Sequence, residues 1–232
     1  MSLRIAIVGY GKMGRMIEAA ALARGNEVTL RLDEHNNSGF EGITPENFKN
    51  VDVAIDFSIP AAAAQNIQRI ATLGVNLVVG TTGWQDQMEH VKNVVAGRDI
   101  GMVWSPNYSV GVNAFFRIVS EAARLLSKEP DYEAWAWEAH HSAKKDAPSG
   151  TLLKIVQDME TAGYTRRVDV SSTRAGAIPG THEIGFDSLA DTITLRHTAR
   201  SREGFALGAV KAAEWIHGKK GFYEFGDILF GQ

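Results

Sequence analysis

The sequence contains no cysteine among its 232 residues. Disulfide bonds, thiolate zinc sites and cysteine nucleophiles are therefore excluded, which fits a reducing cytosol. Neither sign of charge dominates, because 24 basic side chains stand against 27 acidic ones, and nothing indicates a nucleic-acid or membrane surface. No apolar run approaches the roughly 18 residues of a membrane span, and no signal peptide is visible. We expect a cytoplasmic protein that binds neither nucleic acid nor membranes.

The first hundred residues alternate short β-branched runs with longer helical ones. Strands are expected at 4–8, 27–32, 51–57, 75–79 and 101–104, and helices at 13–24, 61–73 and 85–95. Strands separated by helices of this length indicate parallel βαβ units. The pattern predicts an α/β protein with an N-terminal Rossmann-like, doubly wound parallel sheet, whose ligands gather at the carboxyl ends of the strands.

The rhythm changes after Asn107. Helices are expected at 112–126, 151–161 and 205–216, and strand-like runs at 166–173, 181–186 and 191–199. Strands that follow one another without helices between them predict a smaller α+β domain with a mixed or antiparallel sheet. We expect a dinucleotide-binding domain over 1–109, onto which 210–232 pack back, and a substrate-binding domain over 110–209.

The stretch VGYGKMG places Gly9, Gly11 and Gly14 in the spacing G-x-G-x-x-G. The match gains meaning because it follows an expected strand and opens an expected helix. Gly9 permits a tight turn, Gly11 lets the backbone approach a pyrophosphate, and Gly14 allows close helix–strand packing. A simple glycine-rich turn is the alternative. The expected dinucleotide site also includes the intervening residues Tyr10, Lys12 and Met13.

Asp33 follows the second expected strand, at the separation where a carboxylate meets the adenosine ribose. It would accept hydrogen bonds from the ribose hydroxyls and repel a 2′-phosphate. Glu34 follows, where a protein that prefers NADP would more usefully carry an arginine. We therefore expect NADH as the preferred cofactor with NADPH possible, because Lys12, Arg15 and Arg31 soften the preference. Asp33 can alternatively be a turn residue.

Two further segments follow apolar strands, VVGTTGW at 78–84 and WSPNYSVGVN at 104–113. The first offers backbone and hydroxyl groups to the nicotinamide side of a dinucleotide, and the second stands where the chain leaves the first domain. As isolated turns these segments would be unremarkable. The cofactor-binding residues expected here are Gly80, Thr81, Thr82, Ser105, Pro106, Asn107 and Tyr108.

The stretch EAHHSAKKDAPSGT at 138–151 concentrates groups that carry protons and bind anions. His140 and His141 end an expected strand, where adjacent side chains point to opposite sides, so one can act as general acid and the other can bind substrate. Lys144 supplies positive charge. Ser149 is a plausible N-cap for a helix whose first N–H groups would bind a carboxylate or phosphate.

Two alternatives apply to this stretch. It can be a solvated loop between a strand and a helix. It can also bind a metal, but neighbouring strand positions diverge and no cysteine or close carboxylate completes a ligand set, so no metal is expected.

The same stretch is similar to the signature E-x-H-H-x-x-K-x-D-A-P-S-G-T of the dihydrodipicolinate reductase family. The resemblance extends over nearly the whole chain, through GTTGW, RAGAIPGTHEIGF and RHTARSREGFALGAVKAAEWI. It implies NAD(P)H-dependent reduction of 4-hydroxy-tetrahydrodipicolinate, with loss of water, in diaminopimelate and lysine biosynthesis. It also implies a small dicarboxylate substrate and a homotetramer built through the second domain.

Carried over by position, the resemblance implies that His140 donates the proton with Lys144 as its catalytic partner. His141, Gly150 and Thr151 would bind the substrate carboxylates. Two other functions remain as alternatives: another two-domain NAD(P)-dependent oxidoreductase, or a non-catalytic dinucleotide sensor. Four further positions recur in the family without an assigned role and are expected in a buried network or a subunit contact: Arg174, His182, His197 and Arg202.

Overall fold

The computed structural model describes residues 2–231. They form two compact units, one from the N-terminus to Val110 together with the residues from Glu203 onward, and the other from Gly111 to Arg202. The chain returns to the first unit at Glu203 and not at the expected 210, because α7 (Glu203–Ile216) is one uninterrupted helix that belongs to that unit.

The first unit is built on a six-stranded sheet whose order is β10-β5-β4-β3-β1-β2, with every neighbouring pair parallel. The strands are β1 (Arg4–Val8), β2 (Glu27–Leu32), β3 (Val53–Asp56), β4 (Asn76–Val79), β5 (Gly101–Trp104) and β10 (Gly221–Glu224). The predicted doubly wound sheet is confirmed. The sequence did not predict β10, a four-residue run that becomes a strand by pairing with β5.

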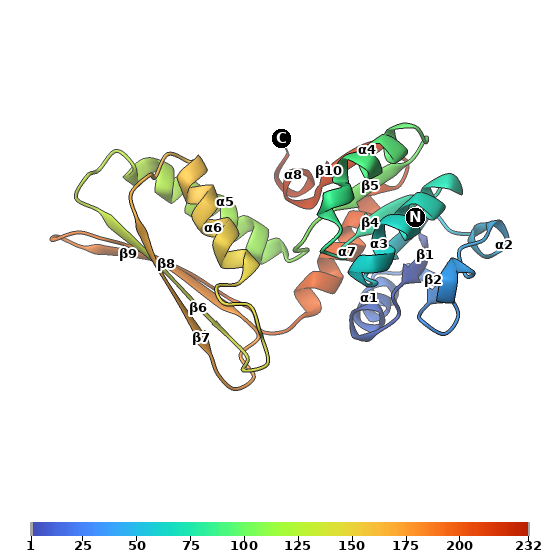
Figure 1. Ribbon diagram of the computed structural model, residues 1–232, viewed down its shortest axis with the longest axis horizontal. Coiled ribbons are helices and arrows are strands. Elements are labelled where there is room, and N and C mark those ends of the chain that lie inside the picture. The colour runs from blue at the N-terminus through green and yellow to red at the C-terminus, as the bar shows by residue number, and fades with distance from the viewer. Residues whose placement is uncertain (1, 232) are drawn as a thin grey trace. The chain divides into compact units, whose positions relative to one another are not determined.

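Helices cover both faces of this sheet (Figure 1). Side chains alternate along each strand, so Ile5 and Ile7 of β1 pack with α1 (Lys12–Ala23) and α7, while Ala6 and Val8 pack toward α3 (Pro60–Thr72) and α4 (Met88–Ala96). The shorter helices are η1 (Ser38–Phe40), α2 (Pro45–Phe48), η2 (Gln85–Gln87) and α8 (Phe225–Phe230). Both faces are thus buried, as a parallel sheet requires.

The second unit contains a four-stranded sheet in the order β7-β6-β8-β9. Its strands are β6 (Glu133–His140), β7 (Val168–Arg174), β8 (Thr181–Asp187) and β9 (Thr192–Thr198). β6 and β7 are parallel, whereas β6–β8 and β8–β9 are antiparallel, so the predicted mixed sheet is confirmed. Two helices, α5 (Val110–Leu126) and α6 (Gly150–Thr161), cover one face.

Within the described residues, no helix is both long enough and apolar enough to cross a membrane.

Candidate active site

The turn between β1 and α1 uses its three glycines for three different reasons. Gly9 has a φ of +92°, and a Cβ there would lie 2.4 Å from the Phe57 carbonyl oxygen. A Cβ on Gly14 would lie 2.7 Å from the carbonyl oxygen of Gly9, whereas one on Gly11 would meet nothing within 4 Å. The open space at Gly11 is what a pyrophosphate needs, so the turn fits the expected dinucleotide.

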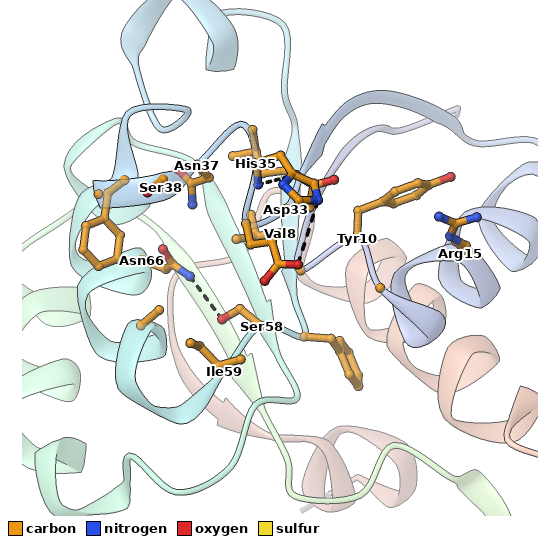
Figure 2. A pocket seen from close by; sticks show the side chains of 18 residues that line it. Val8, Tyr10, Arg15, Asp33, His35, Asn37, Ser38, Ser58, Ile59 and Asn66 are labelled. Carbon is orange, nitrogen blue, oxygen red and sulfur yellow. Dashed lines mark hydrogen bonds and ion pairs between the residues drawn. The ribbon is translucent and has the colours of Figure 1, made fainter.

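A cavity of about 670 Å³ opens beside this turn (Figure 2). Four of the predicted cofactor residues line it: Gly9, Tyr10, Gly11 and Asp33. Arg15, named above for its effect on cofactor preference, also lines the cavity. Other lining residues were not predicted from the sequence, among them His35, Phe40, Ser58, Ile59 and Asn66. A signal for some of them existed, because the segment DFSIP follows the carboxyl end of β3, where ligands of such a sheet bind.

Asp33 shapes the turn after β2. Its Oδ1 accepts hydrogen bonds from the backbone N–H groups of His35, at 2.8 Å, and Asn36, at 3.3 Å. Figure 2 shows the side chain at the rim of the same cavity. The alternative that Asp33 is a turn residue is therefore correct as far as Oδ1 is concerned, and both turn bonds use that one oxygen.

The residues between the glycines have different surroundings. The Tyr10 hydroxyl donates to Glu18, which also accepts from Arg31, and the Arg15 guanidinium lies 5.7 Å from the centre of the Tyr10 ring. Lys12 is exposed, whereas Met13 packs against the core beneath α1. Of the three side chains that stand between the glycines, Tyr10 lines the cavity, whereas Lys12 and Met13 do not.

The loop after β4 is tied to a buried carboxylate that the sequence analysis did not single out. Asp56, at the end of β3, has no exposed surface and accepts hydrogen bonds from Thr81 Oγ1 at 2.8 Å, Ser58 Oγ at 2.7 Å and Asn66 Nδ2 at 2.9 Å. Burial raises the pKa of this carboxyl, and the hydrogen bonds oppose that rise. A Cβ on Gly80 would collide with the Phe57 ring at 2.2 Å. Thr82 is exposed.

The loop after β5 is closed by its own side chains. Ser105 Oγ donates to the Asn107 carbonyl at 2.8 Å and accepts from the Asn107 N–H at 3.1 Å, while Pro106 is exposed. Tyr108 is 1% exposed, and its hydroxyl lies 3.0 Å and 2.9 Å from the carbonyl oxygens of Val79 and Val103. Tyr108 is thus a core side chain that links β4 to β5.

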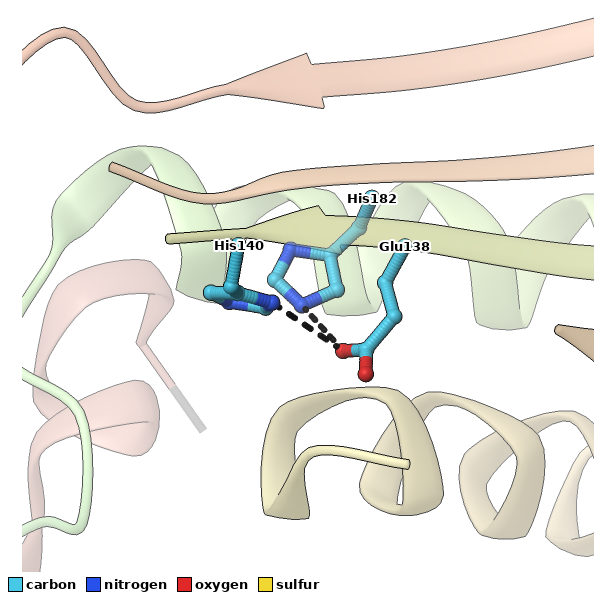
Figure 3. Close-up of side chains that lie close together, drawn as sticks. All are labelled: Glu138, His140 and His182. Atoms are coloured by element: carbon cyan, nitrogen blue, oxygen red, sulfur yellow. Dashed lines mark ion pairs between the residues drawn. The ribbon is translucent and has the colours of Figure 1, made fainter. Parts of the chain in front are cut away.

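In the second unit, β6 delivers part of the stretch that carries the family signature. Glu138 and His140 are two residues apart on the strand and point to the face that α6 covers (Figure 3). His141 follows the strand and is exposed. The Lys144 ammonium pairs with Asp146 at 2.8 Å and 2.9 Å. The two histidines therefore have different environments, as the strand geometry predicts.

The start of α6 completes this loop. Ser149 is the N-cap, as predicted, and its Oγ accepts from the Leu152 N–H at 3.2 Å. Gly150 is exposed and Thr151 is partly exposed. Backbone N–H groups in the first turn of a helix carry partial positive charge, which suits an anionic group.

Glu138 lies at the centre of a buried polar cluster. Its Oε1 accepts from the Ser149 N–H at 2.9 Å, Ser172 Oγ at 2.9 Å and the Arg174 guanidinium at 2.6 Å. Its Oε2 accepts from Ser149 Oγ and lies 3.5 Å from His140 Nδ1. Burial by itself raises the pKa of Glu138, but these hydrogen bonds outweigh it and bring the pKa to about 2. Glu138 is therefore ionised at neutral pH.

Two imidazoles face this carboxylate. The rings of His140 and His182 lie 5.2 Å apart in an edge-to-face arrangement, and His182 Nε2 is 3.6 Å from Glu138 Oε2. Burial lowers the pKa of His182 to about 4, so this ring is neutral at pH 7. Burial also lowers the pKa of His140, and the Glu138 carboxylate opposes the change.

Glu138, His140 and His182 each place one ligand atom within 4.8 Å of the others, a spacing that a metal ion can use. The expectation that no carboxylate lies close to the paired histidines is wrong, because Glu138 lies two residues before His140 on the same face. Its oxygens already accept hydrogen bonds from Arg174, Ser149 and Ser172. The Arg174 guanidinium thus compensates the negative charge of the ionised carboxylate within the protein.

Comparison with known proteins identifies the family. Residues 3–108 match the family model described as dihydrodipicolinate reductase, N-terminus, and residues 111–229 match the corresponding C-terminus. The chain belongs to the dihydrodipicolinate reductase family. This confirms three predictions from the sequence: the family, an oxidoreductase activity and a nicotinamide cofactor.

Named relatives of the family span nearly the whole chain. The 4-hydroxy-tetrahydrodipicolinate reductase of Christiangramia forsetii is 34% identical over 242 residues, covering 98% of each chain. The protein of the same name from Methanoregula boonei is 41% identical over 94% of each chain. A dipicolinate-bound dihydrodipicolinate reductase from Paenisporosarcina sp. TG-14 has the same fold, with a TM-score of 0.82 at 22% identity, over 98% of this chain and 100% of that one.

The structure places the four recurring family positions that had no assigned role. Arg174 and His182 belong to the Glu138 cluster, as the expectation of a buried network requires. The ring of His197 packs against that of Phe115, with 5.9 Å between the ring centres, and burial lowers the pKa of His197. Arg202 is exposed, so within this chain it is not part of a buried network.

Proposed function

We propose that this chain reduces 4-hydroxy-tetrahydrodipicolinate to tetrahydrodipicolinate with loss of water, in diaminopimelate and lysine biosynthesis. The observation that carries the proposal is the buried imidazole of His140, held beside an ionised carboxylate at the start of a loop that carries Lys144 and a helix N-terminus. A dicarboxylate that must be protonated during its reduction needs such a set of groups.

The first unit would hold the cofactor through residues that fit it. The backbone at Gly9, Gly11 and Gly14 would bind the pyrophosphate, and Asp33 would meet the adenosine ribose. Gly80, Thr81, Thr82 and the residues from Ser105 to Tyr108 would shape the nicotinamide side, with Tyr108 acting through the strand ends that its hydroxyl links. When bound, the reduced nicotinamide supplies one hydride, that is, two electrons and a proton.

The residues of the second unit would bind and protonate the substrate. Loss of the ring hydroxyl as water leaves a conjugated cyclic imine with two carboxylates. Once one end of the conjugated system has gained the hydride, negative charge is shared by the ring nitrogen and the carbon next to the reduced one, and His140 donates its proton to that carbon. Lys144 stabilises the developing charge. His141 and the N–H groups of Gly150 and Thr151 bind the carboxylates.

NADH is the preferred cofactor in this proposal, and NADPH is used less well. The turn uses the Oδ1 atom of Asp33. In this proposal Oδ2 accepts hydrogen bonds from the ribose hydroxyls. The side chain of Glu34 is 88% exposed and adds a second negative charge beside the position of a 2′-phosphate. A cytoplasmic location remains a prediction from the sequence.

The deciding experiment follows the absorbance of NADH with the condensation product of pyruvate and aspartate semialdehyde as substrate. We expect oxidation of NADH by the wild-type chain and loss of turnover in His140→Gln, with binding of NADH retained. Binding of NADH without any turnover would instead identify a dinucleotide sensor. Turnover of a different substrate only would identify another oxidoreductase.

We further propose a homotetramer built through the second sheet. Its helix-free face carries Trp135 and Trp137, with Arg196 lying 5.8 Å from the Trp137 ring, and Figure 1 shows α5 and α6 on the other face. Aromatic and arginine side chains on an uncovered sheet are typical of an interface. Sedimentation velocity should give a tetramer for the wild type and smaller species for Trp137→Asp; a monomeric wild type would refute the proposal.

A further inference from the structure

The register of the second sheet gathers polar side chains at one point under α6. Glu138 on β6 lies opposite Ser172 on β7 and His182 on β8, and His140 lies opposite Arg174. Because paired residues share a face, all of these side chains point to the side that α6 covers. The Glu138 carboxylate is shared by three strands and the helix N-cap.

We propose that Glu138 is a positioning residue for His140: its carboxylate accepts a hydrogen bond from the Nδ1–H group of the imidazole and so makes Nε2 the atom that donates a proton to the substrate. This inference rests on the proposed function of His140 as proton donor. The Nδ1 atom is buried without a hydrogen-bond partner and lies 3.5 Å from Glu138 Oε2. Hydrogen bonds in active sites are often this long in the free enzyme and tighten when the substrate binds.

The other side of the ring supports the same assignment. His140 Nε2 lies next to Gly180, where a Cβ would come within 3.2 Å of it. Gly180 has a φ of +149°, a backbone conformation that residues other than glycine rarely adopt. Because residue 180 is glycine, it places no side chain against Nε2 on this side of the ring.

The charged groups around His140 allow the Glu138 carboxylate to stay ionised. From β6, β7 and β8 the ring meets Glu138, Arg174 and His182, and from its own loop it meets Lys144 and Asp146. Arg174 holds Glu138 ionised through a bond of 2.6 Å, while His182 is neutral because burial brings its pKa to about 4. Burial lowers the pKa of His140, and the Glu138 charge opposes this change, so the carboxylate favours the protonated form of this imidazole.

Glu138 also connects the two ends of the loop between β6 and α6. It contacts His140 at one end of the loop and binds Ser149 at the other, while Arg174 donates both to Glu138 and to the Asp146 carbonyl at 2.6 Å. The loop that carries Lys144 is thus anchored at both ends to one carboxylate. A change at Glu138 should therefore affect the orientation of His140 and Lys144 together.

The test is Glu138→Gln in the full-length chain, with NADH and the imine substrate. We expect kcat/KM to fall by about tenfold or more and the dissociation constant of NADH to stay within about twofold, as for the loss of a group that orients a catalytic imidazole. The alkaline limb of the kcat/KM profile should move to lower pH, because the charge that favours protonated His140 is gone. Nitrogen-15 NMR should show the His140 tautomer, Nδ1–H in the wild type and mixed in the variant.

Two further variants separate positioning from folding. Glu138→Gln with Arg174→Gln removes the guanidinium that the single change leaves unpaired, and we expect it to restore the melting temperature but not kcat/KM. Glu214→Gln in the first unit breaks a comparable bond to Arg24, 2.6 Å long, and should leave the pH profile unchanged.

Recovery of wild-type kcat/KM in the double variant would overturn the inference, as would an unshifted alkaline limb or an unchanged His140 tautomer in Glu138→Gln. Absence of turnover in the wild type would count against the proposed function. The tautomer measurement would still test the Glu138–His140 contact.

Discussion

The hydroxyl of Thr81 donates a hydrogen bond of 2.8 Å to the buried carboxylate of Asp56. Asp56 is the last residue of β3, and Thr81 lies in the loop after the neighbouring strand β4, at the carboxyl edge of the first sheet. The bond therefore ties the loop after β4 to the carboxyl end of β3. Asp56 also accepts from Ser58, which lines the cavity beside the glycine-rich turn.

Replacing Thr81 with valine should remove this bond with little change in shape. We expect the free energy of unfolding to fall by about 1 kcal/mol, the usual contribution of one buried hydrogen bond. We also expect the KM for NADH to rise more than kcat falls, because the loops that shape the cofactor site lose a link. Chemical denaturation and steady-state kinetics measure both effects. Thr82→Val, at an exposed position, should leave the free energy of unfolding unchanged.

Much of the first sheet follows from the sequence because its strands are marked by local patterns. The predicted ranges of β1, β2 and β5 agree with the structure at both ends. The sequence of β10 gives no local signal of a strand, because a four-residue strand forms through its pairing with β5 and is too short to show a periodicity. The predicted helix at 85–95 begins as the 3₁₀ turn η2 before α4 starts at Met88.

The candidate site was predictable where it is contiguous in sequence. The loop from His140 to Thr151 and the glycine-rich turn are local motifs. The contact of Glu138 with His182 and Arg174 depends instead on the register of strands that lie about 40 residues apart, since these residues are positions 138, 174 and 182. Likewise, the burial of Tyr108 could not be predicted from its neighbours in sequence, because it depends on the carbonyl groups of β4 and β5 that surround its hydroxyl in the fold.

The ion pair of Glu138 should appear in the acid stability of the protein. Its pKa falls from 4.5 to about 2 on folding, so the folded state is favoured above pH 4.5 and loses that advantage as the pH falls toward 2. The advantage is on the order of 3 kcal/mol. The difference in unfolding free energy between the wild type and Glu138→Gln should shrink over this pH window.

Urea titrations at a series of pH values measure this difference. Glu160→Gln, at an exposed helix position, provides the matched control and should behave as the wild type throughout. A constant difference between the wild type and Glu138→Gln at every pH would show that the carboxylate is not specifically stabilised in the folded chain.

Gly9 and Gly11 should respond differently to the same substitution. Gly9→Ala places a Cβ 2.4 Å from a backbone oxygen at a φ of +92°, so we expect a clear loss of stability. Gly11→Ala places its Cβ in open space, so stability should hold while NADH binds about tenfold or more weakly, because the methyl group occupies the approach to the pyrophosphate. Thermal unfolding and fluorescence titration distinguish the two. Equal stability loss in both would contradict this division.

The cofactor preference can be tested at Asp33 without disturbing its turn. Asp33→Asn keeps an oxygen that can accept from the N–H groups of His35 and Asn36, but it removes the negative charge. We expect kcat/KM with NADPH to rise relative to that with NADH by about tenfold, because one unit charge a few ångströms from a phosphate contributes on the order of 1 kcal/mol or more.

Glu34→Gln is the companion variant for this test. Its side chain is 88% exposed, so solvent screens its charge, and the shift toward NADPH should be smaller than for Asp33→Asn. Raising the salt concentration should reduce both shifts. A clear preference of the wild type for NADPH, or a larger effect at Glu34 than at Asp33, would mean that the ribose is recognised by groups other than the Asp33 carboxylate.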